Sequence, residues 1–362
     1  MIKITDKKDC CGCAACVQRC PKQCISLKED GEGFLYPVVD ESLCVGCGLC
    51  EKVCPIINRP EKLPVKEVLA VKNRNEDERM ASSSGGVFVA LAKKVIDQGG
   101  VVFGAVFDEN WEVKHTCAES MDGVRPMMGS KYVQSRIGDT FRQAEKFLKD
   151  GRKVLFTGSP CQITALHNYL RKDYPNLLSV DFLCHGVPSP GVWRRYLDEV
   201  FDRSARRAAA GKNTVLLSDI HYDNPFMKGF LRNVYLRPSC YRCKCKNGVS
   251  HSDLTIGDFW GIDRISKEFD DDKGVSMLLI LSDKGESVIQ SIEMDKEVFS
   301  LDTAKLLNGG FKERQLIPSK RKWFFKQFNK KCELKKLIIE CSKLTFINRI
   351  INKINYLKQK TI

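Results

Sequence analysis

Residues 10–21 read CCGCAACVQRCP, and residues 44–55 repeat the same pattern as CVGCGLCEKVCP. In each copy three cysteines are separated by two residues, and a fourth follows after three more residues, directly before a proline. Thiolates at this spacing can curl around one iron–sulfur cubane, while the longer spacer carries the fourth cysteine to a second cluster. The duplication therefore predicts two 4Fe-4S clusters within residues 1–58, and it decides the fold of this segment.

The ligand sets follow from exchange of the last cysteine between the two copies. The first cluster is expected to take Cys10, Cys13, Cys16 and Cys54. The second is expected to take Cys44, Cys47, Cys50 and Cys20. The pattern resembles bacterial-type two-cluster ferredoxins. Zinc is the alternative, but zinc sites usually pair two Cys-x-x-Cys hooks over longer separations. Cys11 and Cys24 lie outside the repeat and are interpreted as packing residues, with Cys11 as an alternative to Cys10.

The composition fits a chain that folds around a core in a reducing compartment. Hydrophobic residues make up 43% of the 362 residues and charged residues 29%, so a sizeable core can form. Ten of the 18 cysteines fall within the first 54 residues, which in a cytosolic chain favours metal ligation over disulfides. The polar segment 1–10 is unlike a secretory signal, and no run of eighteen apolar residues occurs. We expect a cytoplasmic protein.

The positive charge is concentrated at the C-terminal end. Residues 311–362 hold 15 Lys and Arg against 3 Asp and Glu, whereas the rest of the chain holds 44 against 42. The overall charge of +14 therefore does not indicate a nucleic-acid-binding protein.

Three parts follow one another along the chain, which predicts an α+β fold. A ferredoxin-like domain over 1–58 precedes a linker with Pro60 and Pro64. A mixed α/β body over 65–318 follows, with an N-terminal part over 65–150 and a C-terminal part over 151–318. Its strands are predicted at 67–72, 101–107, 153–156, 177–183, 215–221, 233–236, 254–256 and 277–281. Its helices are predicted at 87–98, 161–170 and 192–201.

Residues 319–362 form the third part, a basic tail. From Leu334 apolar residues recur every three or four positions with lysines between them, which predicts an amphipathic helix. We expect it to pack on the body with a solvated lysine face; contact with a membrane surface or with an acidic ferredoxin is the alternative.

Three Gly- and Ser-rich stretches of the body are typical of turns that hold phosphate groups. They are Ser82-Ser83-Ser84-Gly85-Gly86, Gly129-Ser130-Lys131-Tyr132 and Thr157-Gly158-Ser159-Pro160. The first and third lead into predicted helices, whose free N–H groups favour anions. Each stretch alone is equally compatible with an ordinary turn or helix cap. No GxGxxG sequence is present, so a Rossmann dinucleotide site is not predicted.

The body contains further cysteines that could bind metal. Cys240-Tyr241-Arg242-Cys243-Lys244-Cys245 is a metal-type hook, and Cys161 begins a predicted helix, where the dipole lowers a thiol pKa. Cys184 follows a predicted strand. Buried packing cysteines and a zinc site remain alternatives.

Four ordered motifs resemble the beta-subunit family of coenzyme F420 hydrogenases and dehydrogenases. They are Gly158-Ser159-Pro160-Cys161-Gln162, Cys184-His185-Gly186-Val187-Pro188-Ser189-Pro190, Cys240-Tyr241-Arg242-Cys243 and Gly257-Asp258-Phe259-Trp260-Gly261. Ser84-Gly85-Gly86 and Lys131-Tyr132 fit the N-terminal half of that family. The resemblance covers about residues 65–300, and a two-cluster module is a common partner domain in the family.

The resemblance implies an FAD-binding body with a third 4Fe-4S cluster. Its ligands would be Cys161, Cys184, Cys240 and Cys243, with Cys245 as an alternative for the fourth place. The flavin pyrophosphate would be held by Ser83, Ser84, Gly85, Gly86, Thr157, Gly158 and Ser159. The isoalloxazine ring or its substrate would lie near Lys131, Tyr132, Asp258, Phe259 and Trp260. Phe259 and Trp260 are equally compatible with plain core aromatics.

These cofactors imply an oxidoreductase. A deazaflavin such as coenzyme F420 or a similar carrier moves a hydride, clusters accept single electrons, and a flavin can do both. We expect electrons to pass between such a carrier and ferredoxin or another redox protein in an anaerobic cell. No side-chain nucleophile is expected, and His185 is interpreted as structural rather than as a proton carrier. The alternatives are a ferredoxin-driven reductase of a metabolite in surface-polysaccharide biosynthesis and a non-catalytic electron-transfer module.

Overall fold

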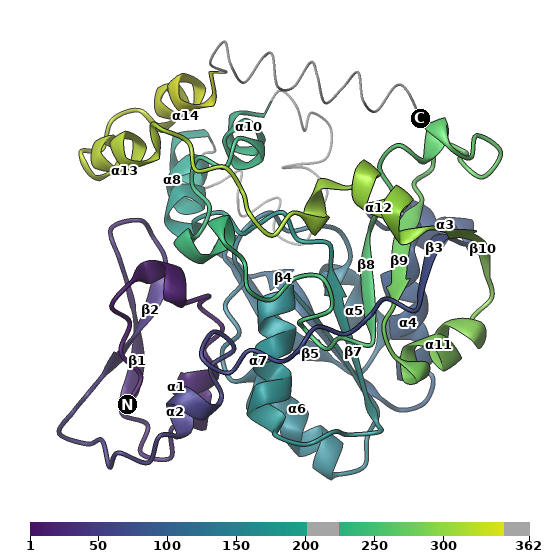
Figure 1. The fold of residues 1–362 in the computed structure, drawn as a ribbon, viewed down its shortest axis with the longest axis horizontal. Helices are drawn as coiled ribbons and strands as arrows, with labels where there is room; N and C mark the ends of the chain where they lie inside the picture. The colour runs from purple at the N-terminus through teal and green to yellow at the C-terminus, as the bar shows by residue number, and fades with distance from the viewer. Residues whose placement is uncertain (201–223, 344–362) are drawn as a thin grey trace.

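The structure is a computed structural model that describes residues 1–200 and 224–343 (Figure 1). Its α+β architecture confirms the predicted fold class. A small cysteine-rich module lies beside a large mixed sheet with helices on both faces. The strand predicted at 215–221 and the tail after residue 343 lie outside the described residues.

One eight-stranded sheet forms the body, in the order β10-β3-β9-β8-β7-β6-β4-β5. Strands β4, β6, β7 and β8 run parallel, and the other neighbours pair antiparallel. The strands are β3 (Glu67–Asn73), β4 (Val101–Phe107), β5 (Val113–Ala118), β6 (Val154–Gly158), β7 (Leu177–Phe182), β8 (Leu254–Asp258), β9 (Ser276–Ile280) and β10 (Met294–Phe299). The strands predicted from the sequence did not include β5 and β10.

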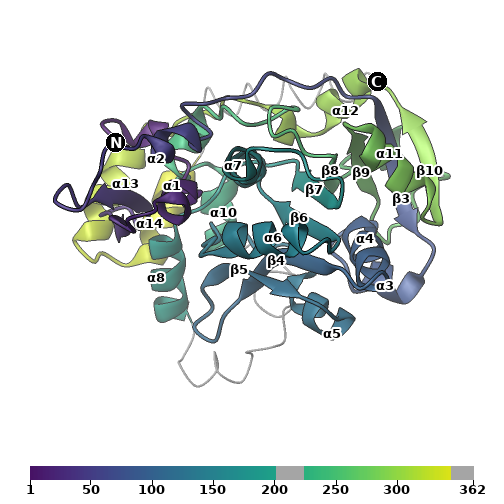
Figure 2. The same ribbon diagram turned by 90° about the horizontal axis from the view of Figure 1, so that it is seen from below.

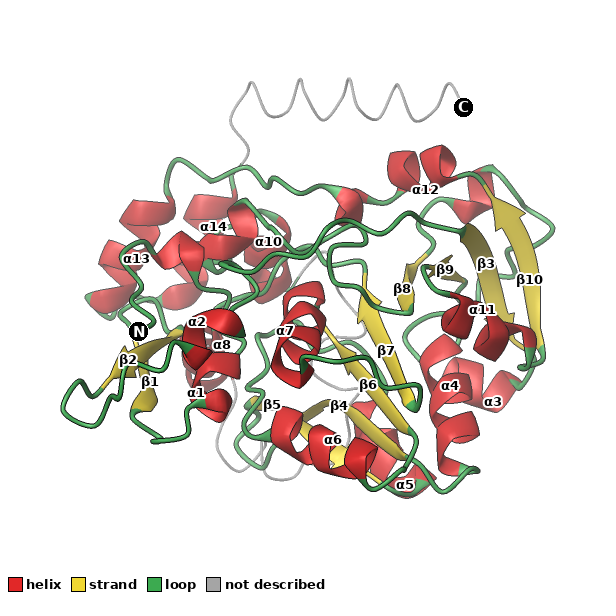
Figure 3. Cartoon of the chain, turned by 60° about the horizontal axis from the view of Figure 1, so that its bottom comes forward, coloured by secondary structure: helices red, strands yellow, loops and turns green. Residues whose placement is uncertain are grey.

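Alternate residues of the central strands enter two separate cores. Phe103 and Phe156 pack beneath α6 (Thr140–Lys149) and α7 (Pro160–Leu170), whereas the preceding residues Val102 and Leu155 face α4 (Val87–Ile96). Figure 3 shows α6 and α7 lying across β4 and β6 on one side of the sheet. Because both faces are covered, these strands read as continuous apolar runs rather than as alternating ones.

The remaining helices connect or flank the strands. They are α3 (Glu76–Met80), α5 (Met121–Val124), α8 (Pro190–Val200), α10 (Pro225–Leu231), α11 (Asp283–Gln290), α12 (Leu301–Leu307), α13 (Arg321–Asn329) and α14 (Leu334–Ser342). Short 3-10 turns lie at η1 (Lys7–Asp9), η2 (Arg125–Met127), η3 (Pro238–Tyr241), η4 (Ile262–Arg264) and η5 (Gly309–Phe311).

The strand predicted at 233–236 is wrong. Asn233 has a left-handed backbone with φ of 60°, and only a single bridge joins Leu236 to Pro188. The apolar residues of this segment, Val234, Tyr235 and Leu236, are buried in the helical cluster around α8 and α10. A short apolar run is compatible with either environment, so tertiary packing decided between them.

The N-terminal module repeats its backbone as well as its cysteines. Gly12 and Ala14 have φ of 74° and 59°, and the matching residues Gly46 and Gly48 have 67° and 70°. These left-handed residues bend the chain inside each Cys-x-x-Cys-x-x-Cys loop. Each loop leads into a short helix, α1 (Ala15–Arg19) or α2 (Leu49–Lys52), and the hairpin of β1 (Ile25–Glu29) and β2 (Leu35–Val39) lies between them.

This module is packed against the body rather than tethered to it. Its residues Cys11, Cys13 and Val53 belong to the same core as Phe156. Helix α1 contacts α6 and α7, as the view from below shows (Figure 2). The carbonyl oxygen of Gln18 accepts from the guanidinium of Arg142, and its side-chain oxygen accepts from the N–H groups that begin α6.

The described part of the tail packs on the body, as expected. Leu334, Leu337, Ile338 and Cys341 of α14 are buried in the cluster formed with α8 and α10. The apolar face of this helix is therefore covered within the protein. Within the described ranges, no helix has the length and apolar character needed to cross a bilayer.

The cap that Gln18 provides to α6 can be tested by Gln18→Leu. Asp139, the residue before α6, makes no side-chain cap, so the substitution leaves the N–H of Phe141 without its acceptor, whereas the N–H of Arg142 retains the Asp139 carbonyl oxygen at 2.9 Å. It also removes a buried amide nitrogen that has no partner among the described residues, which offsets part of the cost. We expect a loss of about 1 kcal/mol in the free energy of unfolding, measured by denaturant titration.

The exposed Lys146 on the same helix gives a matched control, and Lys146→Ala should change stability by less than about 0.5 kcal/mol. Equal stability of the two variants would contradict the capping role of Gln18.

Candidate functional site

A cavity of about 520 Å³ opens at the carboxyl ends of the parallel strands. Ala105 of β4, Thr157 of β6, Phe182 of β7 and Ile256 of β8 all line it. Ligands of open α/β sheets bind in this position, because loops diverge where the strands end. The volume is typical of a site for a small molecule or cofactor.

The three Gly- and Ser-rich stretches meet in the walls of this cavity. Ten of the twelve residues predicted to bind the cofactor line it, and they are Ser83, Ser84, Gly86, Lys131, Tyr132, Thr157, Gly158, Ser159, Asp258 and Trp260. They come from segments far apart in the sequence, which only the sheet topology brings together.

The other two predicted residues, Gly85 and Phe259, do not reach the cavity. A Cβ atom on Gly85 would lie 2.2 Å from the carbonyl oxygen of Val71, so this glycine is required for backbone packing. Phe259 is buried and packs edge-on against Phe299 in the core beneath α12. The core interpretation thus fits Phe259, whereas its neighbour Trp260 is 55% exposed and lines the cavity.

The two helices that begin at the cavity, α4 and α7, differ in the hydrogen-bond partners available at their N-termini. At α7 the side-chain oxygen of Gln162 accepts from the backbone N–H and the hydroxyl of Ser159, so this turn is closed on itself. At α4 the residue before the helix is Gly86, with φ of 80° and no side-chain cap. The N-terminus of α4 is therefore the better position for an anionic group.

Lys131 places a buried amine on the cavity wall. Its Nζ donates to the carbonyl oxygens of Met127, Met128 and Gly129 at 2.9, 2.8 and 3.1 Å. Burial lowers the pKa of this amine to about 7. The three carbonyl oxygens accept all three N–H bonds of the charged form and so favour it. A negative ligand nearby would favour the ammonium state further.

Sequence reasoning missed several cavity residues, among them His115 on β5. Its Nε2 lies 3.0 Å from the carbonyl oxygen of Thr157, and burial lowers its pKa to about 4, so the ring is neutral. Its Nδ1 is buried and has no hydrogen-bond partner among the described residues. No motif marks this histidine; it reaches the cavity because β5 pairs with β4 at the sheet edge.

The cysteines of the body lie directly behind one wall of the cavity. The Ser159 hydroxyl lines the cavity and lies 3.3 Å from the Cys161 sulfur. Cys184 is buried between the lining residues Leu183 and His185. The N–H of Val187, another lining residue, donates to the Cys240 sulfur at 3.4 Å.

Four of these body cysteines interact with one another. Burial raises the pKa of the Cys184 thiol, and the charges of Cys240, Cys243 and Cys161 raise it further. Burial and the charges of Cys243 and Cys161 raise the pKa of Cys240 to about 12. The charges of Cys161 and Cys243 also act on Cys245, so Cys245 stays the alternative for the fourth place.

His185 follows Cys184, and its Nε2 lies 2.6 Å from the Asn233 side-chain oxygen. Its ring packs edge-on against Phe230. Burial lowers its pKa, so a neutral histidine held by hydrogen bonding fits this position.

In the N-terminal module, the first predicted cluster set lies together. Burial and then the charges of Cys10 and Cys54 raise the pKa of the Cys16 thiol to about 12. Cys13 in turn interacts with Cys16 and Cys54. The fourth cysteine of the second repeat is therefore beside the first three of the first repeat, as the exchange rule requires.

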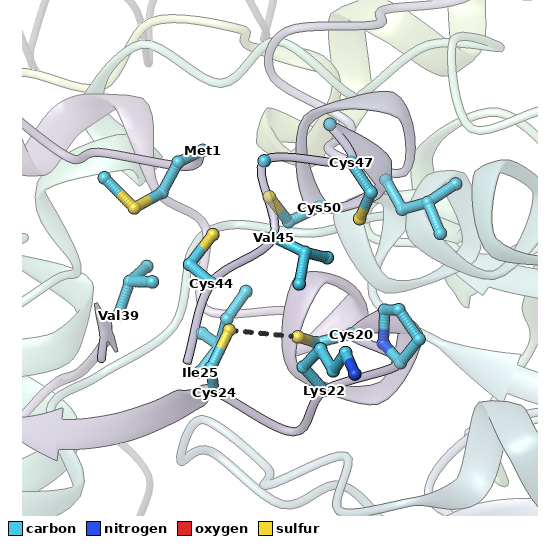
Figure 4. A pocket seen from close by; sticks show the side chains of 14 residues that line it. Met1, Cys20, Lys22, Cys24, Ile25, Val39, Cys44, Val45, Cys47 and Cys50 are labelled. Carbon is cyan, nitrogen blue, oxygen red and sulfur yellow. Dashed lines mark hydrogen bonds between the residues drawn. The ribbon is translucent and has the colours of Figure 1, made fainter. Parts of the chain in front are cut away.

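The second set surrounds a small cavity, seen closely in Figure 4. Cys20, Cys44, Cys47 and Cys50 all line it. Cys24, which lies outside the repeat, is also present, and its sulfur lies 3.3 Å from that of Cys20. Cys47 is exposed, and Leu43, Val45 and Ile57 nearby in the sequence are more than half exposed.

The three cysteine sets follow one another from the surface toward the large cavity. Cys50 of the second set interacts with Cys16 and Cys54 of the first. Cys11, beside the first set, interacts with Cys161 of the body. This order matches a relay of single electrons.

The donor chemistry fits iron–sulfur clusters, because each set contains only thiols. Within residues 1–200 and 224–343, no three Cys, His, Asp or Glu side chains are arranged around a single metal ion. Metal analysis of the protein would separate iron from the zinc alternative.

Comparisons with known proteins found two family models that match this sequence. Residues 151–304 match the family model for the C terminus of the coenzyme F420 hydrogenase/dehydrogenase beta subunit, and residues 9–56 match the 4Fe-4S dicluster domain. Among solved structures, a chain of the F420-reducing nickel–iron hydrogenase complex from Methanosarcina barkeri is 14% identical. That alignment covers 78% of this chain and 91% of the other, with a TM-score of 0.45. No curated protein matches the chain.

The two matched segments include the repeated cysteine loops and the body cysteines around Cys161. This chain therefore combines a segment similar to a 4Fe-4S dicluster domain with a segment similar to the C terminus of the coenzyme F420 hydrogenase/dehydrogenase beta subunit.

Proposed function

We propose that this chain is an iron–sulfur flavoprotein oxidoreductase that passes electrons between a hydride carrier and 4Fe-4S clusters through FAD. The observation that carries the proposal is the shared wall between the large cavity and the body cysteines. Ser159 forms part of that wall, and its hydroxyl is 3.3 Å from the Cys161 sulfur. A redox cofactor in the cavity would therefore lie next to a cluster held by these thiols.

Several features of the cavity support FAD as the occupant. The uncapped N-terminus of α4 provides N–H donors for a pyrophosphate, and the ammonium form of Lys131 would add a positive charge beside it. Val87, Met127 and Val113 give the apolar surface that a flat ring requires. His115 Nδ1 offers a buried acceptor that has no partner among the described residues. A bound flavin supplies the exchange between two-electron and one-electron steps.

The rim of the cavity supports a second, exchangeable ligand. Phe182, Leu231 and Trp260 line the cavity, and each is more than two-fifths exposed. Exposed apolar side chains at a cavity mouth mark a binding surface. A planar hydride carrier, such as a deazaflavin of the coenzyme F420 type, would pack against them. The residues that exclude water and orient the carrier would be these rim side chains.

The N-terminal module would exchange electrons with ferredoxin or a similar redox protein. Cys47 is the exposed member of the second set, so the second cluster would be the one nearest to a partner. The proposed units are 1–58 for the clusters, 65–318 for the flavin and 319–362 for the basic tail. Cysteine thiolates must stay reduced to hold such clusters, so the proposed location is the reducing cytoplasm of an anaerobic cell.

Anaerobic purification followed by iron, sulfide and flavin analysis tests the proposal. A brown protein with iron, sulfide and FAD is expected, and reduced deazaflavin, NAD(P)H and ferredoxin would then be tested as electron donors. Colourless protein that contains zinc or no metal would overturn the proposal. Brown protein without flavin would leave the non-catalytic electron-transfer module as the function.

If the fourth cysteine of each repeat binds the cluster of the other repeat, the iron content of cysteine variants can be predicted. Cys20→Ala should remove about four iron atoms per chain, because it breaks the second set although Cys20 belongs to the first repeat. Cys24→Ala is a matched control, since its sulfur lies 3.3 Å from that of Cys20 but is outside the repeat. Iron loss from Cys24→Ala, or full iron in Cys20→Ala, would contradict the assignment.

Two variants distinguish Cys243 from Cys245 as the fourth ligand of the proposed third cluster. Cys243 interacts with both Cys184 and Cys240, so Cys243→Ser should lose about four iron atoms, whereas Cys245→Ser should retain them. Iron analysis and electron paramagnetic resonance of the reduced chains measure the difference. The opposite pattern would place Cys245 in the ligand set.

Lys131→Met tests the cavity as the flavin site. The substitution keeps the aliphatic stem but removes the buried charge, so FAD should bind about tenfold more weakly. Titration of flavin-depleted protein with FAD, followed by fluorescence, measures the affinity. Lys153→Met is the control, since Lys153 is exposed and outside the cavity lining. Unchanged FAD affinity in a folded Lys131→Met chain would exclude this site.

A further inference from the structure

A buried arginine lies at the boundary between the N-terminal module and the body. The side chain of Arg237 is only 1% exposed, and no Asp or Glu within the described ranges forms an ion pair with it. A buried cation without an anionic partner is costly, so its position requires an explanation.

The contacts of this guanidinium lead to the first cluster set. Its Nε donates to the Cys10 carbonyl oxygen at 2.8 Å, and its Nη2 lies 3.5 Å from the Cys10 sulfur. Nη2 also donates to the carbonyl oxygen of Leu35 at 2.9 Å, and Nη1 donates to the Gln134 side-chain oxygen at 3.1 Å. The carbonyl and amide oxygens among these partners are neutral. The Cys10 thiol is the one partner that becomes an anion, when it binds iron.

The aromatic residues of the hairpin complete the environment. The guanidinium lies 4.4 Å from the ring centre of Tyr36 and 5.3 Å from that of Phe34. The Tyr36 hydroxyl is buried and has no hydrogen-bond partner within the described ranges. Cys10 is among the groups whose charge acts on this hydroxyl. The Arg237 guanidinium and the Tyr36 hydroxyl, which has no acceptor within the described ranges, therefore both lie beside the first cluster set.

The backbone of the same residue organises the body cysteines. The Arg237 carbonyl oxygen accepts from the Cys240 N–H at 2.9 Å, which starts the 3-10 turn that carries Cys240. Cys10 and Cys240 are both among the charges that act on the guanidinium. Arg237 thus lies between the first cluster set and the third.

The glycine of the first loop leaves room for this side chain. A Cβ atom on Gly12 would lie 2.8 Å from Arg237 Nη1, and Gly12 has φ of 74°. In the second loop Gly46 has nothing within 4 Å of the corresponding position. Both glycines satisfy the left-handed backbone, and the one in the first loop also leaves room for a buried cation.

We propose that Arg237 is the counter-cation of the first cluster and raises its reduction potential. This inference rests on the proposed function, because it requires a cluster held by Cys10, Cys13, Cys16 and Cys54. A cluster bound by four thiolates is anionic, and its negative charge grows by one when it is reduced. The cluster gains one electron from a reduced one-electron carrier, and no bond forms or breaks. A fixed positive charge stabilises the reduced state more than the oxidised state.

The position of the Arg237 charge, beside the first cluster set and not the second, predicts the direction of electron flow between the two clusters. The second set is the exposed one, and Arg237 has no contact with it. An electron that enters near Cys47 would therefore move toward the first cluster, which faces Cys161 and Cys240 of the body. Arg237 is a positioning residue in this sense, since it acts through the cluster and not on the substrate.

Redox titration of the anaerobically purified full chain, followed by electron paramagnetic resonance, tests the proposal. The first cluster is identified as the component that a Cys16→Ala chain lacks. Arg237→Gln should lower the reduction potential of this component by at least a tenfold change in its equilibrium, about 59 mV for one electron. The potential of the second cluster should not change.

Two further variants separate charge from structure. Arg237→Lys keeps the charge and should retain most of the parent potential. Arg321→Gln is a matched control: Arg321 is also buried and also joins the module to the body, but it pairs with Glu32, and among the described residues its side chain forms no hydrogen bond to a cysteine. Arg321→Gln should reduce stability without shifting the potential of either cluster.

The outcomes are distinct. An unchanged potential in an iron-loaded Arg237→Gln chain would overturn the proposal, as would equal decreases in Arg237→Gln and Arg237→Lys. If Arg237→Gln does not retain iron, Arg237→Lys decides alone: a potential close to that of the parent supports the role of charge, and a tenfold shift overturns it. Absence of iron from the unsubstituted chain would instead overturn the proposed function itself.

Discussion

The turn between β6 and α7 connects the two halves of the proposed chemistry. In five residues the chain passes from a buried parallel strand, through Gly158 and Ser159 on the cavity wall, to Cys161 behind that wall. Gln162 closes the turn by accepting from the N–H and hydroxyl of Ser159, so the distance between cavity and thiol is fixed by local hydrogen bonds. Because β6 is central in the sheet, this turn cannot move without disturbing both cores.

The N-terminal module extends this fixed geometry outward. Its first loop contributes Cys11 and Cys13 to the core beneath α7, and Gln18 caps α6. The module is thus part of the same packed unit as the cavity, and not a mobile carrier on a linker. Electron transfer between cofactors depends on constant separation, and a packed interface provides it. The second loop, with the exposed Cys47, remains available to a partner.

Electrostatics distinguishes the three cysteine sets although their donors are the same. The first set has the buried guanidinium of Arg237 beside Cys10. The body set has Lys246, a buried lysine whose charge acts on Cys184 and whose Nζ donates to the Lys312 carbonyl oxygen. The second set lines a small, solvent-near cavity without a comparable buried cation among the residues around it. Charge and burial are the properties by which a protein tunes a cluster, so clusters held by the three sets would differ in reduction potential.

The sequence by itself determined the α+β class and the central parallel strands, and it predicted how the repeated cysteines are shared between two clusters, because these depend on local periodicity and on fixed spacings. Only the tertiary structure decided that His115 lines the cavity, that Gly85 and Phe259 do not, and that residues 233–236 are not a strand. Arg237 carried no signal in the sequence, since a single arginine before Pro238 is ordinary there. Its role arises because folding brings it, 227 residues away, to the carbonyl and sulfur of Cys10. Spacing is a property of neighbours in the chain, whereas burial and charge pairing between distant segments exist only once the chain has packed.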